Sequence, residues 1–428
     1  GIEHILATYL RNIGQSQQPA VWVSGFYGSG KSHLVKMLRA LWPDTEFADG
    51  ATARGIANLP QAIQDQFKEL STAGKRHGGL HAASGTLGAS ANGSVRLALL
   101  GILFKSVGLP EQYPVARFVM WLRGERIYDT VRAEVEKNGF NWQEELDNFY
   151  VAEGLHAALL RAKPLLFSTA ATCVETLNNL YPYVQDISSE DMLKAMRQAL
   201  TRDGKFPLTL IVLDEVQQYI GEDSQRSMEV QEAVESCCKN IGGKLLFIGT
   251  GQTAVTGTSN LKKLEGRFTI RVELSDADVD AVIRQVVLAK KPDAIGEIEK
   301  VMQHNLGEIS RHLSNTNIGH RQSDIAYFPQ DYPVLPVRRR FWEATLRVLD
   351  QTGTDSQLRN QLGMVHKVIQ SNLDAPVGCV IPGDSLYFES ADKLLQARVL
   401  PRKVHEKTMT WIKGSADERL VARACGLV

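Results

Sequence analysis

The apolar positions of this chain follow two different patterns. Some short runs are apolar at nearly every position, which predicts strands buried on both faces, as in a parallel sheet. Other segments repeat apolar residues with the period of a helix. We therefore expect an α/β fold in which helices cover both faces of a sheet, giving three layers. The predicted strands are 21–24, 208–213 and 244–249, with a shorter one at 80–83 and another within 264–274.

The length of 428 residues exceeds that of most single domains, so we expect several. The long stretch between the strands at 80–83 and 208–213 is mostly helical in period, and after about residue 291 only helical patterns remain. The predicted parts are a sheet-containing core at 1–110 and 203–275, a helical insertion at 111–202, a helical lid at 276–375 and the start of a further C-terminal region at 376–428.

A glycine-rich loop follows the first predicted strand directly. Gly25, Gly30, Lys31 and Ser32 have the spacing of a phosphate-binding loop, and a helical pattern begins behind them. In such a loop the backbone N–H groups point at the phosphates, the lysine contacts the β- and γ-phosphates during binding and transfer, and the serine hydroxyl completes a Mg²⁺ shell. The sequence therefore predicts binding of ATP or GTP with Mg²⁺. The predicted nucleotide-binding residues are Gly25, Phe26, Tyr27, Gly28, Ser29, Gly30, Lys31, Ser32 and His33.

Two adjacent carboxylates, Asp214 and Glu215, follow the apolar run at 208–213. Ligands of open α/β sheets bind at the carboxyl ends of the strands, so both side chains are expected at the phosphate site. We expect Asp214 to hold Mg²⁺, through water, and Glu215 to polarise the attacking water. The alternative is an acidic helix start behind an ordinary strand.

The apolar run at 244–249 ends in Gly-Thr-Gly-Gln. Thr250 or Gln252 would hydrogen-bond the γ-phosphate or the attacking water and so act as a sensor, and the residues alone do not choose between them. The alternative is turn chemistry, because glycine and threonine also simply end strands.

Two arginines are candidates for contacts to the phosphates. Arg267 stands before the last predicted strand, where ring-forming ATPases place an arginine that reaches into a neighbouring subunit; the alternative is a local salt bridge. Arg359 lies in the first turn of a lid helix and would touch the nucleotide from there, or else pair with Asp355.

Composition excludes several classes of protein. The 48 basic and 48 acidic residues give no net charge, so no global feature demands nucleic acid. The five cysteines show neither metal nor disulfide spacing, and the histidines form no zinc motif. No apolar run approaches the ~18–20 residues of a membrane span, and no signal peptide is recognisable, so we expect a cytosolic protein.

One local concentration of charge stands out, at Arg338, Arg339 and Arg340, before Phe341 and Trp342. Nucleic acid or an acidic partner surface would explain it. We expect instead a solvated face above buried aromatic side chains, because charge runs usually lie in solvent.

Together these motifs resemble the AAA+ class of ring-forming P-loop ATPases. The segments 21–34, 213–220 and 249–253 resemble more particularly the BrxC/PglY-type ATPases of bacterial BREX phage-defence systems. The resemblance extends over most of residues 1–350. Members of that family are much longer, and the apolar end at 424–428 looks cut, so we expect an N-terminal fragment.

The resemblance implies an ATPase motor or switch that forms homo-oligomers and acts with other BREX components, including a DNA methyltransferase, on DNA contacted directly or through partners. One alternative is a nucleotide-dependent scaffold without turnover. Another is an initiator- or loader-type ATPase that opens or marks duplex DNA. The Asp214-Glu215 pair favours hydrolysis, since a scaffold needs no water-activating glutamate.

Overall fold

A computed structural model shows a chain that divides into two compact units. The first comprises Gly1–Gly25 and Gly30–Glu273, and the second comprises Phe26–Ser29 and Leu274–Val428. Each unit is described by itself. The residues that the structure describes are 1–16, 18–25, 29–87, 94–252, 254–255, 258–274, 283–311, 314–317, 319–349, 358–396 and 400–427.

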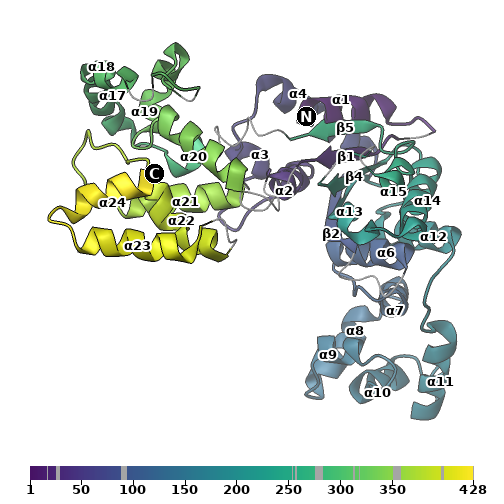
Figure 1. Cartoon of the computed structure of the whole chain (residues 1–428). Helices are drawn as coiled ribbons and strands as arrows, with labels where there is room; N and C mark the ends of the chain where they lie inside the picture. Colours follow the sequence, from purple (N-terminus) through teal and green to yellow (C-terminus); the bar gives the residue numbers. More distant parts are fainter. Residues whose placement is uncertain are drawn as a thin grey trace. The chain divides into compact units, whose positions relative to one another are not determined.

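The first unit contains a five-stranded sheet with the order β2-β3-β4-β1-β5, and every pairing in it is parallel (Figure 1). The strand β1 lies between β4 and β5, so β4 separates it from β3. All carboxyl ends therefore meet at one edge of the sheet. The strands are β1 (Val21–Ser24), β2 (Leu80–Thr86), β3 (Leu208–Asp214), β4 (Leu245–Gly251) and β5 (Ile270–Glu273).

The central strands are buried on both faces because apolar residues occupy both sets of alternating positions. One set, including Trp22, Ile211 and Phe247, belongs to a core shared with α6 and α14. The helix α2 lies against β2, β3 and β4, and α4 lies against β2. The helices of this region are α1 (Ile2–Asn12), α2 (Lys31–Leu41), α3 (Ala53–Ile56), α4 (Gln61–Arg76), α6 (Val95–Ser106), α13 (Val216–Ile220), α14 (Ser224–Asn240) and α15 (Ser259–Lys262).

The segment 111–202, expected as a helical insertion, is helical. Its core is continuous with that beneath the sheet, since α12 packs on both α6 and α14. The insertion is thus part of the first unit rather than a unit of its own. Its helices are α7 (Tyr113–Gly124), α8 (Tyr128–Lys137), α9 (Trp142–Asp147), α10 (Glu153–Ala162), α11 (Ala170–Leu180) and α12 (Ser189–Leu200).

The second unit contains only helices and turns among the residues described between 283 and 427. A small core joins Ile283, Trp342 and Val365 to Ile381, and the Trp342 indole donates to the carbonyl of Gly383 at 3.1 Å. Residues on both sides of position 375 contribute to this core.

The elements of the second unit are short. They are η1 (Ile283–Val287), η2 (Pro292–Ala294), α17 (Ile295–His304), α18 (Leu306–Arg311), η3 (Gln322–Tyr327), α19 (Phe328–Asp331), α20 (Pro336–Leu349), α21 (Leu358–Gln370), α22 (Ser385–Gln396), α23 (Arg402–Lys413) and α24 (Glu418–Leu427). Residues 276–282 of the predicted lid lie outside the described residues.

The solvated face expected at 338–340 was wrong for two of its three arginines. Arg339 is 8% exposed, and its guanidinium lies 3.2 Å from the carboxylate of the fully buried Asp331. Arg340 donates to both oxygens of Asp324, at 2.8 and 2.7 Å. Buried carboxylates from neighbouring elements thus explain the charge run, because a buried ion needs a partner of opposite charge.

Candidate functional site

The loop behind β1 has the backbone that a phosphate cradle requires at the residues described. Gly30 has φ +91° and stands at the N-cap of α2, where a side chain would strain the backbone. Apart from its two chain neighbours, no atom of the described residues lies within 4 Å of the place where its Cβ would be. The amino end of α2 follows directly, and the positive end of a helix dipole favours an anion there.

Lys31 is held at this loop. Its Nζ donates to the carbonyl of Gly25 at 2.7 Å. Burial lowers the pKa of Lys31, and the charges of Asp214 and Glu215 oppose that shift. The lysine therefore lies within electrostatic reach of both carboxylates, although most of the first unit separates them in the sequence.

The end of β3 places Asp214 and Glu215 beside each other. Glu215 has φ 58° and ψ 32°, a left-handed conformation that is uncommon outside glycine. Its N–H donates to Thr250 Oγ1 at 2.9 Å and lies 3.1 Å from Asp214 Oδ1. These bonds hold the strained turn in place, and such strain often accompanies functional sites.

Of the two sensor candidates, only Thr250 lies among these groups. Its hydroxyl donates to Asp214 Oδ1 at 2.5 Å, and the residue is 1% exposed. Gln252 is exposed, and its backbone N–H donates to the side chain of Gln217 at 2.6 Å. The structure thus joins the end of β4 to the turn behind β3 by Thr250 and by Gln217, a contact that the sequence had not suggested.

The two glycines around Thr250 have a packing role that sequence reasoning missed. A Cβ on Gly251 would lie 2.3 Å from Cζ2 of Trp22, and one on Gly249 would lie 3.2 Å from the same ring. Trp22 pairs with Gly249 in the sheet register. The indole therefore fills the space above both glycines, a packing role that adds to the sensor and turn interpretations.

Arg267 lies at the other edge of the sheet. Its carbonyl accepts a hydrogen bond from the N–H of Ala20, the residue just before β1. Arg267 therefore lies at the edge where the strands begin, opposite the edge that carries Asp214. Its guanidinium contacts Glu235 on α14 at 2.5 Å. Arg267 is thus ion-paired within its own unit and lies away from Lys31, so only contact with a second subunit would bring it to a phosphate site.

The remaining predicted residues are placed in part. Ser32 and His33 lie in the first turn of α2, Ser32 partly buried and His33 exposed. Phe26, Tyr27 and Gly28 lie outside the described residues, as does the side chain of Arg359, whose backbone belongs to α21.

The donor groups fit a magnesium nucleotide. The Ser29 hydroxyl is buried and has no hydrogen-bond partner among the described residues. No group of three or more His, Cys, Asp or Glu side chains is arranged for a metal in the part of the chain searched. The expected Mg²⁺ would take one or two protein oxygens plus phosphates and water, and Ser32 and Asp214 would supply such oxygens.

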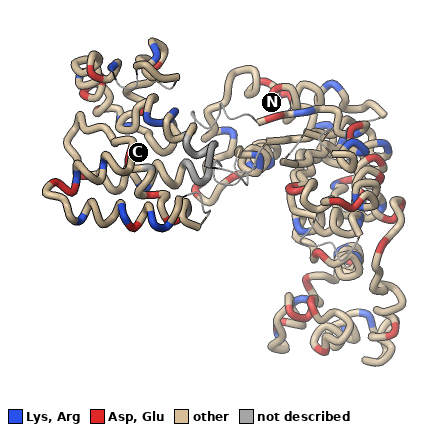
Figure 2. The backbone as a smooth tube through the Cα atoms, in the orientation of Figure 1, with Lys and Arg blue, Asp and Glu red and all other residues tan. Residues whose placement is uncertain are grey.

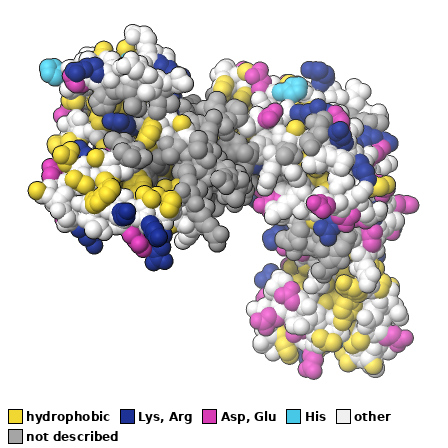
Figure 3. All heavy atoms as spheres, viewed as in Figure 1, with side chains coloured by type: hydrophobic (Ala, Val, Ile, Leu, Met, Phe, Trp, Pro, Cys, Tyr) yellow, Lys and Arg dark blue, Asp and Glu magenta, His cyan; other side chains and the backbone are white. Residues whose placement is uncertain are grey.

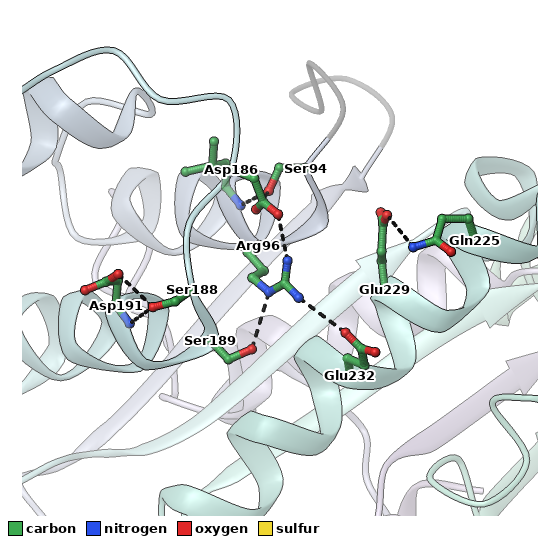
Figure 4. Close-up of polar contacts among 10 residues, drawn as sticks. Ser94, Arg96, Asp186, Ser188, Ser189, Asp191, Gln225, Glu229 and Glu232 are labelled. Carbon is green, nitrogen blue, oxygen red and sulfur yellow. Dashed lines mark hydrogen bonds and ion pairs between the residues drawn. The ribbon is translucent and has the colours of Figure 1, made fainter.

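A second polar network lies around Arg96 on α6 (Figure 4). Its guanidinium donates to Asp186 at 2.8 Å, and to Ser189 and Glu232 at 3.3 Å each. Ser94 caps α6 and also donates to Asp186. The network therefore ties the last part of the helical insertion to α6 and to α14, the second helix after Asp214 and Glu215 in the chain.

The sequence matches no known protein-family model. None of the helices in the described ranges is both long and apolar enough to cross a bilayer.

Proposed function

We propose that this chain is a P-loop ATPase of the AAA+ type that binds ATP with Mg²⁺ and hydrolyses it. The observation that supports the proposal is the meeting of Lys31, Asp214, Glu215 and Thr250 at the carboxyl edge of one parallel sheet. A strand order that inserts β4 between β1 and β3 makes this possible, because Thr250 then stands beside both carboxylates.

Each residue has a separate task in this proposal. Lys31 and the N–H groups at the start of α2 bind the phosphates, and Ser32 and Asp214 hold the metal, Asp214 through water. Bound Mg²⁺ supplies charge neutralisation at the phosphates. Glu215 accepts a proton from the attacking water, and Thr250 keeps both carboxylates in position. The loop carbonyl of Gly25 holds the Lys31 ammonium at the phosphate loop.

The competing function is a scaffold in which ATP sets the assembly without turnover. The turn at Glu215 favours hydrolysis over a scaffold role. Its left-handed backbone costs free energy of folding, and two hydrogen bonds hold it, whereas binding of ATP alone would not require this conformation. An initiator- or loader-type ATPase is disfavoured, since the basic run considered for it includes Arg339 and Arg340, which are occupied by buried carboxylates.

The test separates binding from turnover with two variants. Lys31→Ala should lose ATP affinity in calorimetry, while Glu215→Gln should bind ATP as the parent does and lose turnover by at least about a hundredfold. Glu222→Gln, at an exposed carboxylate just beyond α13, is the matched control and should leave both unchanged. Parent-like turnover in Glu215→Gln would favour the scaffold, and unchanged affinity in Lys31→Ala would refute the phosphate loop.

The cellular role rests on the resemblance to BrxC/PglY-type proteins. We propose a bacterial cytosolic subunit of a BREX phage-defence complex that works with a DNA methyltransferase. Arg267 would then act between copies of the chain, as a homo-oligomeric ring requires. Co-purification of the methyltransferase with the tagged chain from a BREX-positive bacterium tests this role, and its repeated absence under ATP would count against it.

A further inference from the structure

The helix α23 carries an exposed face that holds two lysines and an indole. Trp411 is 62% exposed, and Lys403 and Lys407 precede it on α23 and are exposed as well. Residues four apart lie on the same side of a helix, about 6 Å apart along its axis. We call Lys403, Lys407 and Trp411 the Lys–Trp stripe. An indole so exposed is uncommon, because tryptophan is usually well buried.

The stripe is not the core-facing side of the helix. Thr408 and Ile412 are 8% and 9% exposed and form the side of α23 that is buried within the unit, where α23 packs against α24. Trp411 makes no ring contact with another described residue. The stripe therefore faces outward, while the apolar side of the same helix packs within the unit.

The local charge is positive although the whole chain is neutral. Residues 400–427 hold six lysines and arginines but three carboxylates. Arg402 pairs with Glu406 at 3.0 Å, whereas Lys403, Lys407 and Lys413 have no carboxylate partner in the described part of the chain. Blue segments recur along α23 in Figure 2, and basic side chains gather at the surface of this unit in Figure 3. An anionic ligand would fit such a surface.

The arrangement selects among anionic ligands. A membrane-surface helix keeps its aromatic residues on the side opposite its lysines, whereas here both share one face. Duplex DNA hides its base faces inside the stack, so an indole finds nothing to stack on. A single strand offers phosphates to lysines and bare base faces to an aromatic ring. We propose that the Lys–Trp stripe binds single-stranded nucleic acid, with a base on Trp411 and phosphates on Lys403 and Lys407.

The test measures binding of fluorescent 20-nucleotide oligo-dT and oligo-U to the full chain by anisotropy, without ATP. Trp411→Ala should weaken binding about five- to hundredfold, and Trp411→Phe should keep most of the affinity. Lys403→Gln with Lys407→Gln should lower the slope of log affinity against log salt by about 1.4, because each single-strand phosphate contact contributes about 0.7. The two oligonucleotides distinguish DNA from RNA as the natural strand.

Matched controls come from the first unit. Tyr183→Ala removes an aromatic side chain that is 68% exposed, and Lys137→Gln removes an exposed lysine of α8; neither should change affinity. Equal binding of a duplex or of anionic vesicles, or unchanged affinity in Trp411→Ala, would overturn the proposal. Because ATP is left out and Lys31→Ala should bind the oligonucleotide normally, this result is independent of the proposed ATPase.

Discussion

Replacing Thr250 by valine tests whether one hydroxyl holds the turn at Asp214 and Glu215 in place. Valine has nearly the same shape, so the change removes the donor to Asp214 and the acceptor for the Glu215 N–H without opening a cavity. A neutral hydrogen bond contributes about 1 kcal/mol and one to a charged group about 1.5–3 kcal/mol. The Glu215 N–H still has Asp214 Oδ1 as an acceptor at 3.1 Å, so we expect the lower end of that sum, a loss of about 2.5 kcal/mol in the free energy of unfolding.

The effect on activity follows from the same bonds. Without Thr250 the strained turn at Glu215 is free to relax, which moves the carboxylate away from the water. We expect kcat to fall about ten- to a hundredfold, since general-base catalysis is sensitive to position, while ATP affinity changes little. Urea unfolding gives the stability, steady-state phosphate release gives kcat, and calorimetry gives the affinity.

Two controls make the result specific. Thr250→Ser keeps the hydroxyl and should retain most of the turnover. Thr209→Val removes a fully buried hydroxyl at the other end of β3, where it bonds only the carbonyl of Pro207 at 3.0 Å. That change should cost about 1 kcal/mol and leave kcat intact. If Thr250→Val behaves like Thr209→Val, the hydroxyl is structural and the positioning argument fails.

Three further predictions follow from the packing and charges. Gly251→Ala should destabilise the first unit by about 1–3 kcal/mol in urea, because the new Cβ meets a tryptophan ring, whereas Gly266→Ala has free space and should not. Burial lowers the pKa of Lys290 to about 8, so its charge opposes folding below that pH. Lys290→Met should therefore be more stable than the parent by about 1–2 kcal/mol at pH 7. This advantage should vanish as the pH rises from about 8 past 10.5, the pKa of the lysine in the unfolded chain. Arg267→Ala should slow turnover without weakening ATP binding. Mixing this variant with Glu215→Gln should restore activity that neither variant has alone. If the two variants co-assemble and the mixture stays inactive, Arg267 is only the structural partner of Glu235.

Local features of the phosphate loop and of the strands were readable from the sequence. The spacing of Gly25, Gly30, Lys31 and Ser32 is a property of neighbouring residues, and Gly30 has the positive φ that its type permits. The runs at 208–213 and 244–249 form β3 and β4 because unbroken apolar stretches can be buried on both faces. The carboxylates behind β3 lie where the carboxyl ends of parallel strands meet.

The choice between Thr250 and Gln252 needed the tertiary structure. Both lie at the carboxyl end of β4, and the order of the strands, with β4 next to β3, brings only Thr250 to Asp214. The same holds for the glycines beside Thr250, whose Cβ positions are blocked by a tryptophan from β1. Sheet order is set by contacts between distant segments, and no local pattern records it.

The environment of the charged side chains was the feature that the sequence predicted least well. A run of three arginines reads as a solvated surface, yet Arg339 and Arg340 pair with Asp331 and Asp324, and Arg267 pairs with Glu235. A sequence shows a charged residue but not the residue with which it forms an ion pair. A charged side chain can be buried only where the fold places an oppositely charged side chain beside it. The sequence by itself therefore determined the strands and the glycine conformation of the loop, while the tertiary structure decided which charges are paired, because pairing is a property of distance in space.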